Sequence, residues 1–293
     1  MTQQVIAMAF DAAYAPHAGA AIASVAEHCD AAREITFLMV HDGVPEPLQA
    51  QVQACAPAAQ FLWVGAPPHL QSFPGRGYVS RATYLRLCLP ELAPPDVRKV
   101  LYLDCDLIVC RDVRPLFALD LGGRPVGAVF DYWIDPATFA QRWGLERGGR
   151  YFNAGVLLLD LQRLRENGGF ARAVALLAQN LQQFEFLDQD ALNHAFWNDW
   201  TAMDPIWNVQ RAMLAPGHET AAQKADWPRG RRPGIVHYTS SHKPWVREAY
   251  TPYAWLYHRA RAATPFGAIE DFTWLDRAVA WWRWARASLF LRA

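Results

Sequence analysis

Two aspartates, Asp104 and Asp106, stand one residue apart after the apolar run 100–103, and a second apolar run, 107–109, follows them. Side chains two positions apart on an extended chain leave the same face, about 6.5–7 Å from each other. A turn at Cys105 would bring both carboxylates within reach of one hard divalent cation, which prefers oxygen ligands. Carboxylates after a buried strand are costly to desolvate unless a positive group neutralises them. The alternative is that this pair only caps a turn or helix.

A histidine and a lysine later in the chain have the chemistry to complete such a site. His237 ends the apolar segment 235–238, and Lys243 follows six residues later, before Pro244 and Trp245. An ammonium group there would neutralise phosphate as a point charge. Two carboxylates and an imidazole, with phosphate oxygens in the remaining positions, suit Mn²⁺ better than Zn²⁺. The alternative is a histidine with ordinary hydrogen bonds.

Three further polar segments have both a structural and a functional interpretation. Residues 188–190 read Asp-Gln-Asp at a predicted helix start, where the helix dipole favours an aspartate. Capping explains one aspartate but not Gln189, so the two interpretations have equal support. Asn153 and Ala154 would equally form a plain loop that enters a strand. Asp11, after the first predicted strand, would serve as a turn former.

Strands and helices alternate along the chain. In a fold of this kind, the polar side chains described above would meet at one edge of a sheet. Strands are predicted at 5–10, 35–41, 61–64, 100–104, 125–130, 156–161 and 235–238, and helices at 17–29, 46–55, 80–87, 162–182 and 188–198. This alternation predicts an α/β fold with a mostly parallel sheet, and such sheets bind ligands at the carboxyl ends of their strands. Residues 214–233, rich in Pro and Gly, predict a long mobile loop, which is usually functional.

The composition limits the possible partners and the compartment. With 293 residues, the chain can form one large α/β domain, or one domain plus an appendage. Lys plus Arg and Asp plus Glu balance at 28 each, so the net charge gives no support for nucleic-acid binding. Five scattered cysteines without a CxxC indicate neither a disulfide framework nor a zinc site. We find no apolar leader or bilayer-spanning stretch, and we predict a cytoplasmic protein.

Together these segments resemble the retaining glycosyltransferases of the lipopolysaccharide α-galactosyltransferase and glycogenin family, known as family 8. Six segments carry the resemblance in the expected order: 9–14, 83–87, 101–106, 152–156, 188–193 and 237–245. The resemblance implies a single Rossmann-like catalytic domain of the GT-A type over residues 1–246. Residues 247–293 would form a helical tail rich in Trp and Arg.

The resemblance also implies a UDP-sugar donor and a bound Mn²⁺, with Mg²⁺ as a substitute. Asp104, Asp106 and His237 would hold the metal, and Lys243 would meet the diphosphate. The uridine would lie against Ala9, Asp11 and Tyr14. The other donor contacts would come from Arg86, Asp104, Cys105, Asp131, Asn153, Ala154, Asp188, Gln189 and Ser240.

Two positions depart from the family pattern. Ala13 stands where an Asn that contacts the nucleotide is common, so one contact to uracil or ribose would be missing. Ser240 stands where the family usually has a Gly. A backbone amide can face phosphate there only if Ser240 adopts the dihedral angles that Gly allows.

The chemistry that the resemblance implies is transfer of glucose or galactose with retention in an α-linkage. Breaking the glycosyl–phosphate bond builds negative charge on the diphosphate, which Mn²⁺ and Lys243 would stabilise. No carboxylate is an obvious nucleophile on the far face. Gln189 stands at the matching position but is a poor nucleophile, and Asp188 lies next to it, so these two are the candidate catalytic residues. We favour same-face attack, in which Gln189 steadies the oxocarbenium-like centre and the departing phosphate takes the acceptor's proton. Double displacement stays open.

The acceptor and the tail are less determined. The resemblance implies a saccharide or glycolipid acceptor, of a lipopolysaccharide or another surface glycan. In the tail, apolar residues recur near helical spacing among arginines; the apolar residues are Trp274, Leu275, Trp281, Trp282 and Leu289. This pattern predicts peripheral contact with the inner face of the cytoplasmic membrane. The alternative is a helix packed on the domain.

Two other functions remain open from the sequence. One is a Mg²⁺-dependent phosphohydrolase with Asp104 as an aspartyl-phosphate nucleophile. That loop normally follows the first strand, whereas several βα units precede Asp104 here. The other is a nucleotide-sugar binder without catalysis.

Overall fold

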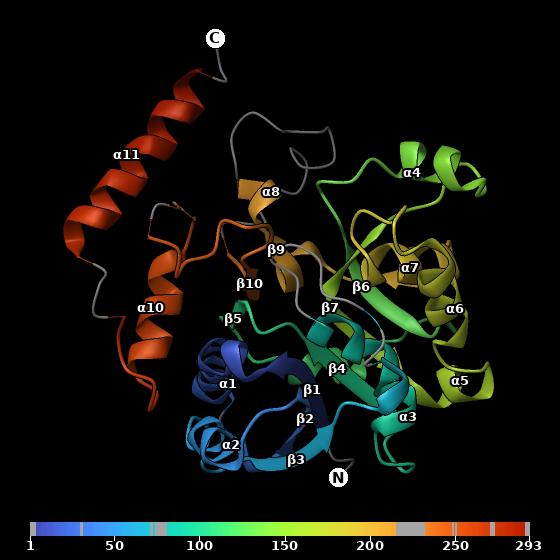
Figure 1. Ribbon diagram of the computed structural model, residues 1–293, viewed down its shortest axis with the longest axis horizontal. Coiled ribbons are helices and arrows are strands. Elements are labelled where there is room, and N and C mark those ends of the chain that lie inside the picture. Colours follow the sequence, from blue (N-terminus) through green and yellow to red (C-terminus); the bar gives the residue numbers. More distant parts are fainter. Residues whose placement is uncertain are drawn as a thin grey trace.

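A mixed seven-stranded sheet forms the centre of the molecule (Figure 1). The computed structural model describes residues 4–29, 32–70, 73, 81–214, 232–247, 249, 251–269 and 273–290. In spatial order the strands are β3 (Gln60–Gly65), β2 (Ile35–Asp42), β1 (Gln4–Asp11), β4 (Lys99–Leu103), β7 (Phe152–Asp160), β6 (Val126–Phe130) and β8 (Trp200–Ala202). Neighbours pair in parallel except β7, which is antiparallel to both β4 and β6. The predicted α/β fold with a mostly parallel sheet is confirmed.

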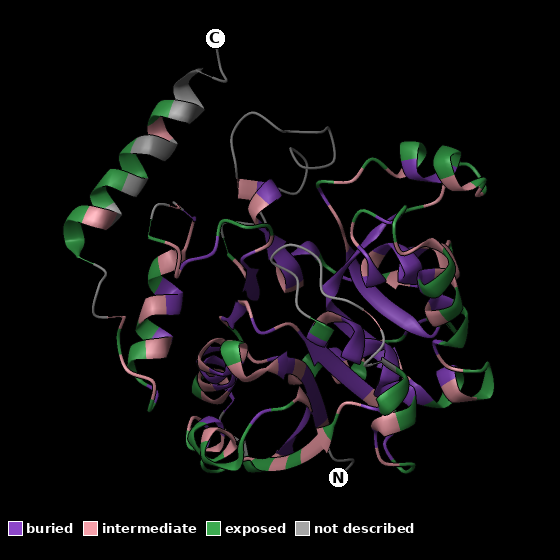
Figure 2. Cartoon of the chain, viewed as in Figure 1, coloured by how far each residue is buried: buried purple, intermediate pink, exposed green. Residues whose placement is uncertain are grey.

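Helices cover both faces of this sheet, so its central strands are buried on both sides (Figure 2). Alternate residues of β1 belong to different apolar clusters: Ile6 and Met8 pack with α1 (Ala15–His28) and α2 (Glu46–Gln53). Val5 and Ala7 pack in the cluster on the opposite face. The helices of that face are α3 (Leu89–Leu92), α5 (Leu161–Glu166), α6 (Ala171–Asn180) and α7 (Asp188–Ala195). Burial on both sides explains the continuous apolar runs of β4 and β7.

A smaller three-stranded sheet connects the two halves of the chain. Its strands are β5 (Leu107–Val109), β10 (Ile235–His237) and β9 (Val209–Gln210), with β10 in the middle. β10 runs antiparallel to β5, in a register that places His237 opposite Leu107. Since β5 begins directly after Asp106, this pairing brings a residue more than 130 positions later beside the acidic pair.

Several elements differ from the sequence-based expectations. The helix predicted over 162–182 is two helices, α5 and α6, because Gly168 and Gly169 lie between them with φ of 80° and 64°. The helix predicted over 80–87 is a 3₁₀ helix, η4 (Arg81–Cys88), which continues into α3. Helix α4 (Pro136–Trp143), strand β8, the short helix η6 (Pro205–Asn208) and helix α8 (Arg211–Leu214) were not predicted. Most of the predicted loop 214–233 lies outside the described residues.

The chain ends in two helices beyond the sheet. Helix α10 (Ala254–Ala262) packs on α1, and Leu256, Tyr257 and Ala260 share an apolar cluster with Ala20 of α1. Helix α11 (Trp274–Phe290), red in Figure 1, lies at the edge of the molecule and is largely exposed (Figure 2). Among the described residues, no helix is long and apolar enough to cross a membrane. The division at residues 246 and 247 stays a prediction.

Candidate active site

The acidic pair and the late histidine converge where β4 ends. Nε2 of His237 lies 3.2 Å from Oδ1 of Asp106 and 3.7 Å from Oδ2 of Asp104. Main-chain bonds fix the turn, because Asp104 N donates to Gly155 O at 2.8 Å and Tyr238 N donates to Asp106 O at 2.9 Å. The three side chains offer ligand atoms that all lie within 4.8 Å of one another, which is the spacing of a metal site. The structure therefore brings together the three predicted metal ligands.

Asn208, which the sequence did not single out, sets the orientation of His237. Nδ1 of His237 lies 3.0 Å from Oδ1 of Asn208, and Nδ2 of Asn208 donates to Oδ1 of Asn153 at 2.9 Å. When Nδ1 carries the proton and donates it to Asn208, Nε2 keeps its lone pair toward the aspartates. Asn208 is fully buried at the end of η6, and no spacing pattern in the sequence marks it.

Gly155 is required beside these ligands because there is no room for a side chain. A Cβ at this position would overlap Cε1 of His237 and lie 2.7 Å from Oδ2 of Asp104. Its main chain lies in β7, which pairs with β4 and cannot move away without breaking the sheet. The Asn153–Ala154–Gly155 segment is thus part of the site and not a plain loop.

Two cations neutralise the acidic pair, as the cost of its burial required. Lys243 pairs with Oδ2 of Asp106 and also donates to the carbonyl of Tyr238 at 2.7 Å. Nη2 of Arg86 lies 3.2 Å from Oδ1 of Asp104, and Tyr102 donates a hydrogen bond of 2.7 Å to the same oxygen. Although burial opposes ionisation, Lys243 and His237 hold the pKa of Asp106 well below its usual value.

Arg86 also joins the acidic pair to helix α7. Its Nε lies 2.8 Å from Oδ2 of Asp188, and its Nη1 donates to Ala154 O at 2.6 Å. Thr83 donates to the other Asp188 oxygen at 2.9 Å. Burial raises the pKa of Asp188 to about 6 against the opposing charge of Arg86. Despite its burial, the carboxylates of Asp104 and Asp188 raise the pKa of Arg86 above its usual value.

Gln189 is held at both ends of its side-chain amide. Its Oε1 accepts hydrogen bonds from Ala154 N at 3.0 Å and from Nδ2 of Asn153 at 3.2 Å. Its Nε2 donates to Oδ2 of Asp131 at 3.1 Å and to the Tyr151 hydroxyl at 3.3 Å. The amide dipole is therefore fixed in direction at the carboxyl end of the sheet, beside Arg86 and the acidic pair.

The start of α7 explains the second aspartate of the 188–190 segment. Asp190 accepts hydrogen bonds from the main-chain N–H groups of Glu185 and Phe186 and from the Tyr151 hydroxyl. Its role is structural, whereas Asp188 and Gln189 face the acidic pair and β7. Leu187, just before them, has a φ of 49°, a strained value for a leucine. The strained backbone of Leu187 lies directly before Asp188 and Gln189, the two residues that point toward the site.

The residues expected to bind uridine lie around the end of β1. Cys105 is buried, with Sγ 3.7 Å from Ala9 O, so the turn between the aspartates packs on β1. Asp11 accepts from the N–H groups of Ala13 and Tyr14 and so caps the short helix η1 (Ala12–Tyr14). Burial, and next the charge of Asp106, raises the pKa of Tyr14 above its usual value.

Ser240 resolves the second departure from the family pattern. Its φ is 72°, in the region that favours Gly, so the serine adopts the backbone conformation that a glycine would take. Its side chain accepts from His242 N at 3.3 Å. This local bond within the turn stabilises a conformation from which Lys243 reaches Asp106.

Fold and site together match a class of solved enzymes. The structure of the galactosyltransferase LgtC in complex with donor and acceptor sugar analogues superposes with a TM-score of 0.78 and 27% sequence identity, covering 92% of this chain and 98% of that one. A mixed α/β sheet that carries this acidic site is the GT-A fold of glycosyltransferases.

Residues 5–249 match the model of glycosyl transferase family 8, and the chain belongs to that family. It is 24% identical to General stress protein A of Bacillus subtilis over 88% of its own length and 93% of that protein. It is 26% identical to the lipopolysaccharide 1,2-glucosyltransferase of Escherichia coli, over 67% of its own length and 59% of that enzyme. Several streptococcal glycosyltransferases that it matches are longer, and it spans 22% to 40% of their lengths.

Proposed function

We propose that the protein transfers glucose or galactose from a UDP-sugar, with retention and in an α-linkage, to a saccharide acceptor of a lipopolysaccharide or other surface glycan. One observation carries the proposal: in a family 8 chain, Asp104, Asp106 and His237 converge with Lys243 beside them. The relatives support the acceptor class, since one is a lipopolysaccharide glucosyltransferase and the solved galactosyltransferase LgtC binds donor and acceptor sugar analogues.

The donor set of the site fits a hard divalent metal ion. Two carboxylates and one imidazole are contributed from within 4.8 Å of one another, without a thiolate, which suits Mn²⁺ or Mg²⁺ better than Zn²⁺. Asp104, Asp106 and His237 would hold the ion, with Asn208 as the partner that orients His237. When bound, the ion supplies electrostatic stabilisation of the diphosphate that leaves the sugar.

The side chains of this protein prepare the donor for cleavage. Uridine would lie at Ala9, Asp11, Tyr14 and Cys105, and the diphosphate would meet Lys243 and the amide of Ser240. Lys243 already lies beside the acidic pair, so the ammonium group needs little movement to stabilise the developing negative charge. Arg86, Asp131, Asn153 and Ala154 would position the sugar together with helix α7.

The contacts of Asp188 support attack from the same face. Thr83 donates to one of its carboxylate oxygens and Arg86 forms an ion pair with the other, so a covalent bond with the sugar would cost one of these contacts. In the same-face route the bond from C1 to the diphosphate breaks, and the acceptor hydroxyl bonds to C1. The hydroxyl proton passes to the departing phosphate. The products are the α-glycoside and UDP.

The first experiment tests metal-dependent cleavage of the donor. We expect purified protein to release UDP from UDP-glucose or UDP-galactose with Mn²⁺, and chelation to stop it. Asp104→Asn should lower the rate by at least about a hundredfold, since preorganised charge is usually the largest catalytic contribution. Asp120→Asn, in an exposed loop, is the control.

Other results would favour the alternatives. Phosphate release from monoesters would support the phosphohydrolase, and donor binding without turnover would support a binder. Equal consumption of every nucleotide sugar after complete chelation would contradict the proposal.

A second experiment addresses Gln189. A fixed dipole near C1 would stabilise positive charge on the sugar ring, so Gln189→Ala should lower kcat by about 10²-fold with a smaller change in KM. A structure of LgtC with an active-site glutamine-to-glutamate substitution is consistent with a glutamine in that enzyme's site. Undiminished turnover by Gln189→Ala would remove this residue from the mechanism.

We also propose that the protein works in the cytoplasm at the inner membrane surface, with helix α11 in contact with lipid. Trp274, Trp281 and Trp282 are exposed by 79%, 53% and 56%, which is unusual for tryptophans that pack on a domain. The side chain of Leu289 lies outside the described part of the chain.

A further inference from the structure

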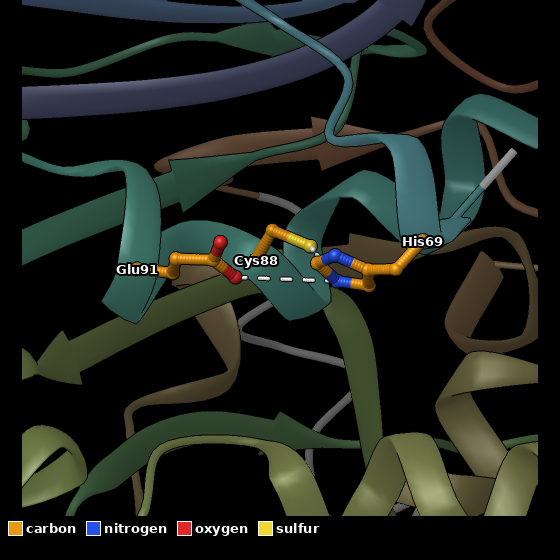
Figure 3. Close-up of side chains that lie close together, drawn as sticks. All are labelled: His69, Cys88 and Glu91. Atoms are coloured by element: carbon orange, nitrogen blue, oxygen red, sulfur yellow. Dashed lines mark hydrogen bonds and ion pairs between the residues drawn. The ribbon is translucent and has the colours of Figure 1, made fainter.

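A second group of metal-ligating side chains lies on η3 (Pro68–Leu70) and on the η4–α3 segment: His69, Cys88 and Glu91 (Figure 3). Nε2 of His69 lies 3.7 Å from Sγ of Cys88 and 4.0 Å from Oε2 of Glu91. One ligand atom from each residue falls within 4.8 Å of the others. Nothing in the proposed transfer reaction uses these three residues.

Their spacing is close to that of a tetrahedral zinc site. With a Zn–S bond of roughly 2.3 Å and Zn–N and Zn–O bonds of roughly 2.0–2.2 Å, neighbouring ligand atoms lie roughly 3.4–3.6 Å apart. The observed 3.7 Å and 4.0 Å exceed this by a few tenths of an ångström. The side chains of His69 and Glu91 are 50% and 62% exposed and can rotate by that amount.

The chemistry of this set differs from that of the acidic site. A thiolate, an imidazole and a carboxylate favour Zn²⁺, whereas two carboxylates and an imidazole favour a harder ion. The sequence did not indicate a zinc site, because His69 and Cys88 are 19 positions apart and no CxxC is present. The contact depends on how η3 meets η4 in the fold.

The segment that carries Cys88 and Glu91 is held rigidly. The guanidinium of Arg165 donates to the main-chain carbonyls that end α3 and follow it; these belong to Pro90, Ala93, Pro94, Pro95 and Val97. Cys88 itself is 2% exposed, so its sulfur has one fixed position. The backbone that carries two of the ligands is therefore preorganised, and only His69 comes from another segment.

The three residues also line a surface cavity of about 510 Å³, together with Gly168, Gly169 and Phe170. A metal held by three protein ligands keeps a fourth position, and the cavity gives water or a small anion access to it. Arg165, the cation of this cavity wall, is engaged with carbonyl groups. Anion binding here would therefore need the metal.

We propose that His69, Cys88 and Glu91 bind one Zn²⁺ ion that is independent of the catalytic metal. Zinc would join η3 to the η4–α3 segment, and η4 carries Arg86, two residues before Cys88. Because zinc binds this arrangement only in the folded state, it stabilises the position of Arg86 through the chain. The proposal does not depend on the transfer reaction.

Cobalt provides a direct test on the full chain. The protein is stripped with a chelator and titrated with Co²⁺, whose charge-transfer absorption in the near ultraviolet requires a bound thiolate. We expect its amplitude at saturation to correspond to one thiolate-bound Co²⁺ per chain, and we expect Zn²⁺ to displace this ion. Cys88→Ser should abolish the absorption, and His69→Ala should weaken Zn²⁺ binding by at least about tenfold.

Matched variants separate the two sites and control for folding. Cys55→Ser, at a partly buried cysteine outside the cluster, and Asp104→Asn, in the acidic site, should both keep the cobalt absorption. His69 is half exposed, so His69→Ala should fold normally, and Zn²⁺ should raise the Tm of this variant less than that of the wild type. Failure of the wild type to develop the absorption, its persistence in Cys88→Ser, or unchanged Zn²⁺ affinity in His69→Ala would each overturn the proposal.

Discussion

At the scale of single residues, the site is a set of buried charges that compensate one another. Asp106 pairs with Lys243, and Arg86 pairs with both Asp104 and Asp188. Each anion is costly to bury alone, and removal of one cation would leave a carboxylate without its partner. The burial of the two aspartates therefore depends on Arg86, which lies on η4 and faces α7.

At Asp188, the balance between the cost of burial and the attraction to Arg86 can be measured from how stability depends on pH. Its pKa is raised from 3.8 to about 6, so between these pH values the folded state holds a proton that the unfolded chain releases. As pH rises through this window, the free energy of unfolding of the metal-free wild type should fall relative to Asp188→Asn. The slope is at most about 1.4 kcal/mol per pH unit, and the difference is constant above pH 6.

Urea unfolding of both proteins from pH 4 to pH 7, with chelator present, measures this difference. Asp120→Asn, which changes an exposed aspartate, should run parallel to the wild type. If the free energy of unfolding of the wild type rises with pH relative to that of Asp188→Asn, the attraction to Arg86 outweighs the cost of burial.

The proposed metal ligands could be predicted from the sequence better than the residues that hydrogen-bond to them. Asp104 and Asp106 come after an apolar strand and His237 ends another, so their convergence at one sheet edge could be inferred. Tyr102 also carried a signal, since it lies two positions before Asp104 on the same face of β4. Asn208 carried none, because its contact with His237 depends on how η6 and β10 pack.

At the scale of elements, β7 sets the space available to the metal ligands. Gly155→Ala should lower Mn²⁺ affinity by at least about tenfold, because the added methyl group overlaps His237 and crowds Asp104. Titration calorimetry with Mn²⁺ measures the loss. Gly65→Ala is the matched control, since a Cβ there has no neighbour within 4 Å. Equal affinity for both variants would mean that β7 yields more easily than its pairing with β4 suggests.

Helices and strands could be predicted where the local sequence pattern determines them, but not where their arrangement depends on pairing with distant strands. β1, β2 and β3 alternate with α1 and α2 at the expected spacing, so their parallel order follows from the βαβ pattern. The antiparallel direction of β7 did not follow, because an apolar run reads the same in either direction. Gly168 and Gly169 were visible in the sequence and break the helix predicted over 162–182.

At the scale of the whole molecule, the tail combines a packed helix with an exposed one. α10 is fixed on α1 by its apolar face, whereas α11 is tied at its start by an ion pair of 2.8 Å between Arg247 and Asp276. The exposed tryptophans of α11 thus extend from a helix that is separate from the packed one. This division predicts that membrane contact and catalysis can be separated.

Deletion of residues 272–293 should abolish sedimentation with anionic phospholipid vesicles and leave donor hydrolysis unchanged. Trp281→Ser with Trp282→Ser should lower vesicle affinity by at least about tenfold, because two large apolar side chains no longer enter the interface. Trp133→Ser, at a tryptophan that is 60% exposed elsewhere on the surface, should bind vesicles like the wild type. If the shortened protein sediments as well as the full chain, the exposed face of α11 has a role other than lipid contact.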